Sequence, residues 1–343
     1  MKIKGLGCSM PERVVTNDDI LKEVEEFSSP YLEDGQMGQV LTKIKTLFRM
    51  SGTQKRHLRH DGDRAYEYAK KAAEQALERA ELKPTDIDLL LYVGVARGWV
   101  EPGMATFFQH ELGMTNATGF DLLDACLSWL RGFHITHNFF KNGVYNNVMI
   151  LNAEFFNEYH DYTIKSLDEV AYRFAQLTLG ESATATILSN EDNGIEPYFE
   201  FKTDPSLHDL CKVPLPNIHS YNNAEKCPQV DPLRFFAYSA EMFKAAKKMI
   251  PEMYLNSQNL QNRHCDIAFG HSASKSLIDE VANQLHLEDQ AVNLYSEFGN
   301  TVSASIPTAM CWALDHDRLK RGMQMMLFMG SAGFSVGICH MAY

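Results

Sequence analysis

Short apolar segments alternate with amphipathic helical segments along this chain, and the alternation occurs twice. The first half carries strand-like runs at residues 3–7, 87–95, 118–123, 147–153 and 183–188. The second half repeats the scheme at residues 196–201, 266–270, 291–294, 325–329 and 333–339. Helical segments between such runs are typical of an α/β sheet that is buried on both faces. We therefore expect an α/β fold made of two duplicated halves, residues 1–190 and 191–343.

Three segments lack the periodicity of a helix or a strand. We expect a loop at residues 28–40, because it begins with Ser-Ser-Pro and contains two glycines. Residues 155–178 are polar, aromatic and irregular. Residues 203–232 form a long stretch with five prolines, after which a helix is expected at 235–253. Because long loops usually have a function, residues 203–232 are candidates for the wall of a substrate tunnel.

Composition excludes several classes of function. The chain has 343 residues and a formal net charge of -12, which argues against nucleic acid as the main partner. We find neither an apolar run long enough to span a membrane nor a signal peptide at the N-terminus. Seven scattered cysteines without a C-x-x-C pair indicate reduced thiols, a cytoplasmic location and no structural zinc or other bound metal.

One cysteine occupies a position suited to a nucleophile. Cys126 lies at the junction between the apolar run 118–123 and a helical pattern that starts at Leu127. The dipole and the free N–H groups of a helix N-terminus favour a thiolate over a thiol. The alternative is a buried cysteine that packs as a small apolar side chain.

Two further polar stretches follow predicted strands in the second half. His271 comes directly after the run 266–270, and Asn300 lies in Gly299-Asn300-Thr301, ahead of a predicted helix at 303–314. A cysteine can attack a thioester carbonyl, while a histidine and an asparagine amide donate hydrogen bonds to the enolate or oxyanion that forms. The matched positions of Cys126, His271 and Asn300 therefore favour thiol catalysis.

The chain resembles the ketoacyl-ACP synthase III branch of the thiolase superfamily from residue 3 to its C-terminus. The stretches that carry the resemblance are Gly5-Leu6-Gly7, Pro11 to Asn17, Ser51-Gly52-Thr53 through Arg56, Asp124-Ala125-Cys126, Gly299-Asn300-Thr301 with Ala304-Ser305-Ile306-Pro307, and Gly333-Phe334-Ser335-Val336-Gly337. The resemblance implies a five-layered αβαβα fold, a homodimer, and acyl-CoA or acyl carrier protein as substrate, with no cofactor.

The resemblance also implies roles for individual residues. Cys126 would be acylated, and His271 with Asn300 would stabilise the enolate when a malonyl or second acyl thioester attacks in a Claisen condensation. The backbone N–H groups of Cys126 and Gly333 would form the oxyanion hole of the acyl-enzyme. Two alternatives stay open: transfer of the acyl group to an alcohol or amine, and a non-catalytic partner subunit in a heterodimer.

The chain departs from the family pattern where the family handles CoA. The family's His-Gln-Ala-Asn is His271-Ser272-Ala273-Ser274 here, and its phosphate-contacting arginine falls at Ser276. The tryptophan and arginine that clamp the adenine align near Thr46 and Met50, and the glycine-rich segment reads Gly180 to Thr184. These departures indicate a specialised member with another acyl donor or a protein-bound substrate.

Two other features have functional and structural interpretations. Glu101-Pro102 resembles the Glu-Pro of the OleA-like branch, where the glutamate reaches the neighbouring subunit's site and acts as base; alternatively, Glu101 is a first-turn helix glutamate. An acidic carrier protein could dock on basic side chains, which alternatively form a solvated surface; the candidates are Lys244, Lys247, Lys248 and Lys275.

Three further patterns in the sequence have functional interpretations as well as structural ones. Gly270 to Ser274 approximates the nucleophile elbow of an α/β-hydrolase but lacks its final glycine. His57 with His60, and His134 with His137, have the spacing of metal ligands, although we expect the second pair to lie on a solvent or dimer face. Trp129 and Phe133 could line an acyl tunnel, but core packing is the default expectation for both.

Overall fold

Two five-stranded sheets form the centre of the computed structural model, which describes residues 1–156, 159–221 and 231–343. The first sheet has the order β1 (Lys2–Ser9), β7 (Ser182–Ser189), β6 (Asn147–Glu154), β4 (Leu89–Val93) and β5 (Thr118–Leu122). The second has the order β12 (Ala291–Val292), β11 (Ile267–Gly270), β13 (Gln324–Ser331), β14 (Ser335–Ala342) and β8 (Tyr198–Thr203).

The two sheets have one topology. Counted along the chain within each sheet, the strands lie in the spatial order first, fifth, fourth, second, third. In both, the second strand runs parallel to the third and the fourth, whereas the fifth runs antiparallel to its two neighbours. The duplication is therefore present in the fold, while the boundary between residues 190 and 191 stays a prediction.

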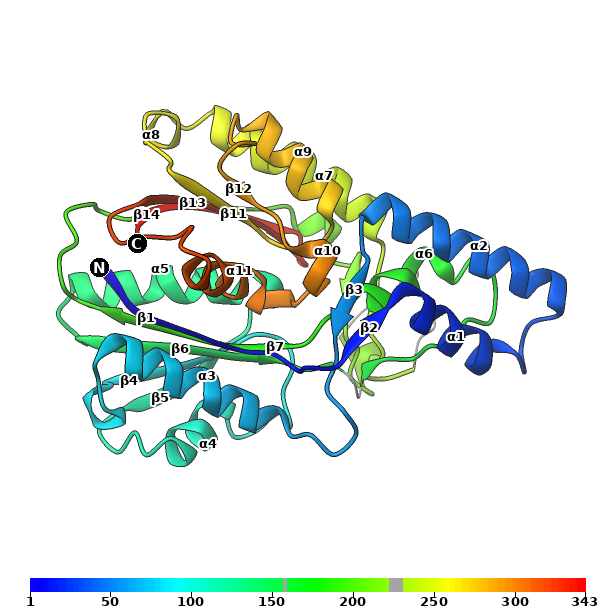
Figure 1. Cartoon of the computed structure of the whole chain (residues 1–343), viewed down its shortest axis with the longest axis horizontal. Helices are drawn as coiled ribbons and strands as arrows, with labels where there is room; N and C mark the ends of the chain where they lie inside the picture. The colour runs from blue at the N-terminus through cyan, green and yellow to red at the C-terminus, as the bar shows by residue number, and fades with distance from the viewer. Residues whose placement is uncertain (157–158, 222–230) are drawn as a thin grey trace.

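Helices complete five layers (Figure 1). Helices α5 (Ser128–Lys141) and α11 (Ser305–Asp315) lie between the sheets, and α3 (Ala65–Ala80) and α4 (Met104–Glu111) cover the outer face of the first sheet. Helices α7 (Ser239–Leu255) and α9 (Lys275–Gln284) cover the outer face of the second sheet. This arrangement confirms the predicted αβαβα fold.

A lateral extension projects from the layers beside the sheets (Figure 1). It contains β2 (Val14–Thr16), α1 (Asn17–Ser28), α2 (Asp34–Ser51) and β3 (Lys55–His57). The prediction of a loop at residues 28–40 was wrong for its second part, because α2 begins at Asp34. Val40, Ile44 and Phe48 recur every four residues and are buried, whereas both glycines of the segment lie on the exposed side of the helix.

The two other irregular segments contain short elements only. Residues 155–178 include α6 (Val170–Arg173) and the 3-10 helix η4 (Phe174–Thr178). The described part of 203–232 contains β9 (Cys211–Lys212), which pairs with β10 (Phe236–Ala237). Because residues 236 and 237 belong to this strand, the helix expected from residue 235 begins only at Ser239. The remaining short elements are η1 (Pro84–Asp86), η2 (Ala125–Leu127), η5 (Pro205–Leu207), η6 (Ile218–Ser220), α8 (Gln258–Gln261), α10 (Tyr295–Phe298) and η7 (Val302–Ala304).

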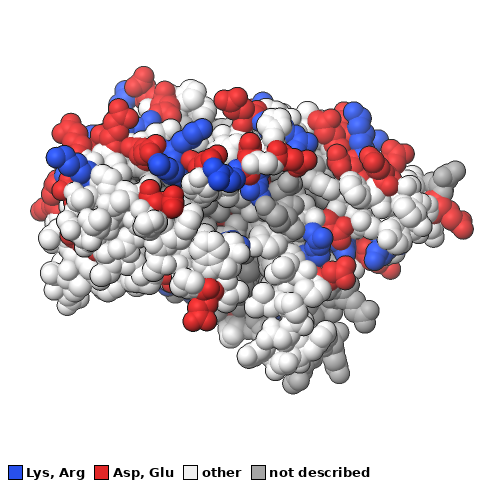
Figure 2. Space-filling model, turned by 90° about the horizontal axis from the view of Figure 1, so that it is seen from below, with Lys and Arg blue, Asp and Glu red and all other residues white. Residues whose placement is uncertain are grey.

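Charged side chains are unevenly spread over the surface. On the face shown in Figure 2, they gather mainly along one border and leave a broad area without charge. None of the helices in the described residues is long and apolar enough to cross a membrane. The described ranges also hold no group of three or more His, Cys, Asp or Glu side chains able to bind a metal ion. Cys227 lies outside the described residues.

Candidate active site

Cys126 lies in η2, the tight turn that connects β5 to α5. The preceding residue, Ala125, has a φ of 46°, a left-handed conformation that makes the turn sharp. The N–H of Leu127 donates to the Asp124 carbonyl over 3.0 Å and to Ser331 Oγ on β13 over 3.2 Å. The turn that carries the cysteine is therefore fixed by contacts from both halves of the fold.

The resting form of Cys126 is a thiol. Burial raises the pKa of the Cys126 thiol well above its usual range, and the neighbouring Cys211 and Glu154 raise it further. The expectation of a thiolate at a helix N-terminus was wrong in this respect, because burial disfavours the charged form of the sulfur. Deprotonation of Cys126 therefore requires a base during the reaction.

His271 follows β11 and is held in one tautomer. Ser305 Oγ donates its proton to the Val302 carbonyl over 2.9 Å. The oxygen of Ser305 must therefore accept from His271 Nδ1–H, 2.7 Å away, and this leaves Nε2 with its lone pair. Because burial lowers the pKa of His271 to about 4, the ring is neutral at pH 7.

Asn300 is oriented by its own turn. Its side-chain oxygen accepts the Val302 N–H over 2.9 Å, so the amide nitrogen is the group left to donate to a ligand. Its backbone N–H donates to the Thr178 carbonyl, and its backbone carbonyl accepts the Gly180 N–H. These contacts with the first half place the Asn300 turn beside the cysteine turn.

Cys126, His271 and Asn300 line one cavity of about 300 Å³. Most of the other lining side chains are apolar, and they come from both halves of the chain. The structure thus brings together the three residues that the sequence placed after separate strands. An apolar enclosure with a few convergent polar groups is the usual form of a small-molecule site.

The turn between β13 and β14 borders the same cavity. Gly333 has a φ of 128°, which favours glycine, and its neighbours Ala332 and Phe334 line the cavity. Among the backbone hydrogen bonds of turns and loops in the described residues, none has the N–H of Cys126 or of Gly333 as its donor. Their role as an oxyanion hole stays a prediction.

Two residues of the site were missed at the sequence level. Cys211 of β9 lines the cavity together with Cys126, and burial raises the pKa of its thiol to about 12. It lies in the aperiodic stretch 203–232, where only the general expectation of a tunnel wall pointed to it.

The other missed residue is Glu154, at the end of β6, which is fully buried. Its carboxylate accepts N–H groups from Val95 at 3.2 Å, Ala96 at 3.0 Å and Ser303 at 3.3 Å, and it also accepts the Ser303 hydroxyl. Burial raises the pKa of Glu154, and these hydrogen bonds oppose the rise. The carboxylate thereby joins a loop of the first half to the turn that follows Asn300.

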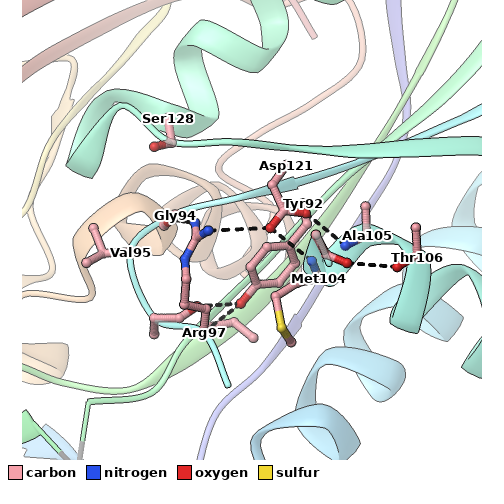
Figure 3. Close-up of polar contacts among 12 residues, drawn as sticks. Tyr92, Gly94, Val95, Arg97, Met104, Ala105, Thr106, Asp121 and Ser128 are labelled. Carbon is pink, nitrogen blue, oxygen red and sulfur yellow. Dashed lines mark hydrogen bonds and ion pairs between the residues drawn. The ribbon is translucent and has the colours of Figure 1, made fainter. Parts of the chain in front are cut away.

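Glu101 is exposed and does not line the cavity of its own chain. Figure 3 shows the polar contacts that fix the flanking segments. Asp121 of β5 accepts the N–H groups of Met104 and Ala105, each over 2.9 Å, at the start of α4. Arg97 lies 3.5 Å from Asp121 and donates to the Gly94 carbonyl over 3.1 Å. The segment that carries Glu101 is thus tied to the sheet at both ends.

The four candidate docking lysines lie on the outer helices of the second half. Lys244, Lys247 and Lys248 surround a shallow hollow on α7, where Lys247 forms an ion pair with Glu280. Lys275 begins α9, and its Nζ lies 2.6 Å from Asp279. Carboxylates therefore partly offset the positive charge of this surface.

The paired histidines and the two aromatic residues of α5 lie at different depths in the fold. His137 is 8% exposed and its ring lies 5.8 Å from that of Phe199 of β8, so the expectation of a solvent face was wrong for this residue. His134 is half-buried, with its ring 5.2 Å from that of Phe199, and the expected dimer face stays a prediction. Trp129 and Phe133 are fully buried in the central core, which confirms the default expectation for both.

Comparisons with known proteins agree with this geometry. A family described as 3-Oxoacyl-[acyl-carrier-protein (ACP)] synthase III matches residues 120–205, and the corresponding C-terminal family matches residues 255–343. Beta-ketoacyl-[acyl-carrier-protein] synthase III of Sulfurimonas denitrificans is 27% identical over 97% of this chain and 95% of its own. The enzyme of the same name from Methylococcus capsulatus is 26% identical over 100% and 98%.

Solved structures match over nearly the whole fold. The 3-oxoacyl-[acyl-carrier-protein] synthase III of Aquifex aeolicus superposes with a TM-score of 0.79 at 22% identity, covering 100% of this chain and 99% of its own. A variant of Xanthomonas campestris OleA, solved with lauric acid and lauroyl-CoA, gives a TM-score of 0.81 at 18% identity, with 99% and 98% covered. Together with the family matches, these likenesses do not support the α/β-hydrolase alternative.

Proposed function

We propose that this chain, which belongs to the 3-oxoacyl-[acyl-carrier-protein] synthase III family of thiolase-fold condensing enzymes, forms its acyl-enzyme on Cys126. The observation that carries the proposal is the shared apolar cavity of Cys126, His271 and Asn300. An acyl-transferring enzyme that makes carbon–carbon bonds needs a nucleophile for the acyl group, a base for the thiol and a donor for an enolate, and Cys126, His271 and Asn300 can supply these in turn. The neutral His271 accepts at Nε2, so the donation to the enolate that the sequence assigned to both His271 and Asn300 falls to Asn300.

The first half-reaction follows from the protonation states. The neutral His271 presents Nε2 as an acceptor, so it can take the proton of the Cys126 thiol as the sulfur attacks the thioester carbonyl. The low pKa of His271 then favours the return of this proton to the departing thiolate. The products are an acyl thioester on Cys126 and a free thiol.

The second half-reaction is a Claisen condensation. A malonyl thioester loses carbon dioxide, and its enolate attacks the acyl carbonyl and expels the Cys126 thiolate. The thiolate then takes up a proton from solvent, because the neutral His271 carries none on Nε2. Asn300 donates its amide N–H to the enolate oxygen, since its side-chain oxygen is already occupied by Val302. The N–H groups of Cys126 and Gly333 stabilise the oxyanion on the acyl carbonyl.

Glu101 offers a second route, in which it deprotonates a second acyl thioester instead of a malonyl one. Since Glu101 lies outside its own cavity, this route requires a second copy of the chain. Exposed apolar side chains support a homodimer at this edge: Val100 is 71% exposed, Leu123 61%, Phe120 40% and Trp99 39%. Strand β5 is also an edge strand that pairs with β4 alone.

The substrates we propose are acyl thioesters of CoA or of an acyl carrier protein, in fatty-acid-related metabolism in the cytoplasm. No cofactor is needed for either half-reaction, because the cysteine, the histidine and the backbone donors supply all the chemistry. An acidic carrier would dock near Lys244, Lys248 and Lys275, beside the outer helices that border the cavity.

Intact-protein mass spectrometry tests the proposal. Incubation with a panel of acyl-CoA and acyl-carrier-protein donors should add one acyl group per chain, and Cys126→Ala should abolish the increase. Cys211→Ser is the matched control, because that thiol lines the same cavity. A wild-type protein that gains no mass with any donor would refute the proposal, as would an adduct that survives in Cys126→Ala.

A further inference from the structure

An apolar arm of the cavity extends away from the polar residues into the outer helix layer of the second half. Two helices and the second sheet form it. We call it the α7–α9 arm and define it by Ala246, Ile250, Ile278, Val281, Phe328 and Phe334, all of which line the cavity. In Figure 1, α7 and α9 lie together over β11 and β13. The lining residues of the arm belong to these two helices, to β13 and to the turn that follows it, so the second half alone forms the arm.

The lining of the arm is buried and entirely apolar. Each of the six side chains is at most 3% exposed to solvent. A water molecule needs two to four polar partners to occupy a cavity, and these side chains offer none. Since protein interiors are packed as tightly as organic crystals, an open space among such residues calls for an apolar occupant.

We propose that the α7–α9 arm binds the hydrocarbon tail of the acyl group carried on Cys126, so that medium-length acyl thioesters are preferred to acetyl. This rests on the proposed function, because the arm matters only if Cys126 is acylated. The whole cavity, in which the arm and the polar end are joined, has a volume of about 300 Å³, on the order of ten water-sized groups at about 30 Å³ each. An acetyl group leaves most of that space empty.

Two small residues keep the arm open. A Cβ placed on Gly330 would lie 3.4 Å from Ala246 Cβ, 3.2 Å from Phe334 Cζ and 3.9 Å from Ile250 Cδ1. Positions 246 and 330 therefore lie side by side in the wall of the cavity, within van der Waals distance. A leucine at position 246 would extend into space that the tail occupies, which makes Ala246 the residue that sets chain length.

The test compares rates of acylation of Cys126 with acetyl-, octanoyl- and dodecanoyl-CoA. We expect the wild-type protein to react faster with octanoyl- than with acetyl-CoA. Ala246→Leu should slow octanoyl and dodecanoyl transfer about tenfold or more, the scale at which overpacking a filled site acts, and leave acetyl transfer within about twofold. Ala240→Leu, at an exposed position of the same helix, is the matched control and should leave all three rates unchanged.

The outcomes separate the two proposals. If Ala246→Leu reacts with all three donors at wild-type rates, or if the wild-type protein prefers acetyl-CoA, the arm does not hold the tail. If the wild-type protein reacts with no donor, the proposed function itself fails. Should Ala246→Leu not fold, Ala246→Val carries the same test: a slower dodecanoyl transfer supports the arm, and an unchanged ratio of dodecanoyl to acetyl rates overturns it.

Discussion

The two halves share one topology, but their outer layers are filled in opposite ways. In the first half, α3 packs on β1 through alanines, and a Cβ on Gly5 or Gly7 would lie 2.0 Å from the Ala76 carbonyl oxygen or 1.9 Å from that of Ala72. At these two positions the backbone of α3 leaves no room even for a Cβ. In the second half, α7 and α9 cover the sheet with longer side chains and leave the apolar arm between them.

This difference shows how a duplicated fold divides its tasks. The first half supplies Cys126 on a rigid support, and the second supplies His271, Asn300 and the space beyond them. The side chains of Cys126, His271 and Asn300 meet where the halves join. Glu154 connects the loop of Ala96 in the first half to the turn of Ser303 in the second. Close packing on one side and an open cavity on the other are thus two solutions for the same arrangement of strands.

Substitutions of glycine test this contrast with the largest expected effect. Gly7→Val should lower the free energy of unfolding by at least about 3 kcal/mol, because the added carbons collide with the backbone of α3. Gly330→Ala in the second half should cost less than about 1.5 kcal/mol, since its Cβ has contacts of 3.2 Å or more with side chains. Urea denaturation measures both; similar losses would contradict the contrast.

Acidification is expected to have the next largest effect. Burial lowers the pKa of His271, and of His160 in the first half, from about 6.5 to about 4. Between these values the unfolded chain binds more protons than the folded one, so stability falls as the pH drops from about 6.5 to about 4. Each histidine contributes at most about 3 kcal/mol. Thermal or urea unfolding at a series of pH values measures the slope.

A single substitution separates the two histidines. His271→Gln should remove the part of the pH-dependent loss that His271 contributes and leave the share of His160 in place. A slope identical to that of the wild-type protein would mean that His271 already titrates normally in the folded state.

Glu154→Gln should give the smallest change in stability. A neutral amide can accept at one oxygen only, so some of the Val95, Ala96 and Ser303 donors lose their partner, at about 1–3 kcal/mol. The turn after Asn300 would loosen while the cysteine turn keeps its contacts. We expect condensation to slow more than acylation of Cys126, as measured by product formation against intact mass. Equal slowing of both steps would contradict the role assigned to Glu154.

Sequence patterns predicted the elements and residues whose positions depend on the local periodicity of apolar side chains. The strands of the two five-stranded sheets, most helices, and the strand-end positions of Cys126, His271 and Asn300 followed from apolar runs and from the residues directly after them. The short strands β2, β3, β9 and β10 did not. The start of α2 was missed because two glycines on its exposed side look like loop residues. Cys211, Glu154 and the α7–α9 arm depend on contacts between distant segments, and the raised pKa of Cys126 depends on burial, which no local pattern reports.

The central claim is that Cys126 carries the acyl group, and peptide mapping after incubation with octanoyl-CoA tests it most directly. The digested protein should show the octanoyl mass on the peptide that contains Cys126, with the peptide of Cys211 unmodified. An octanoyl group found on Cys211, or on no cysteine at all, would contradict the account.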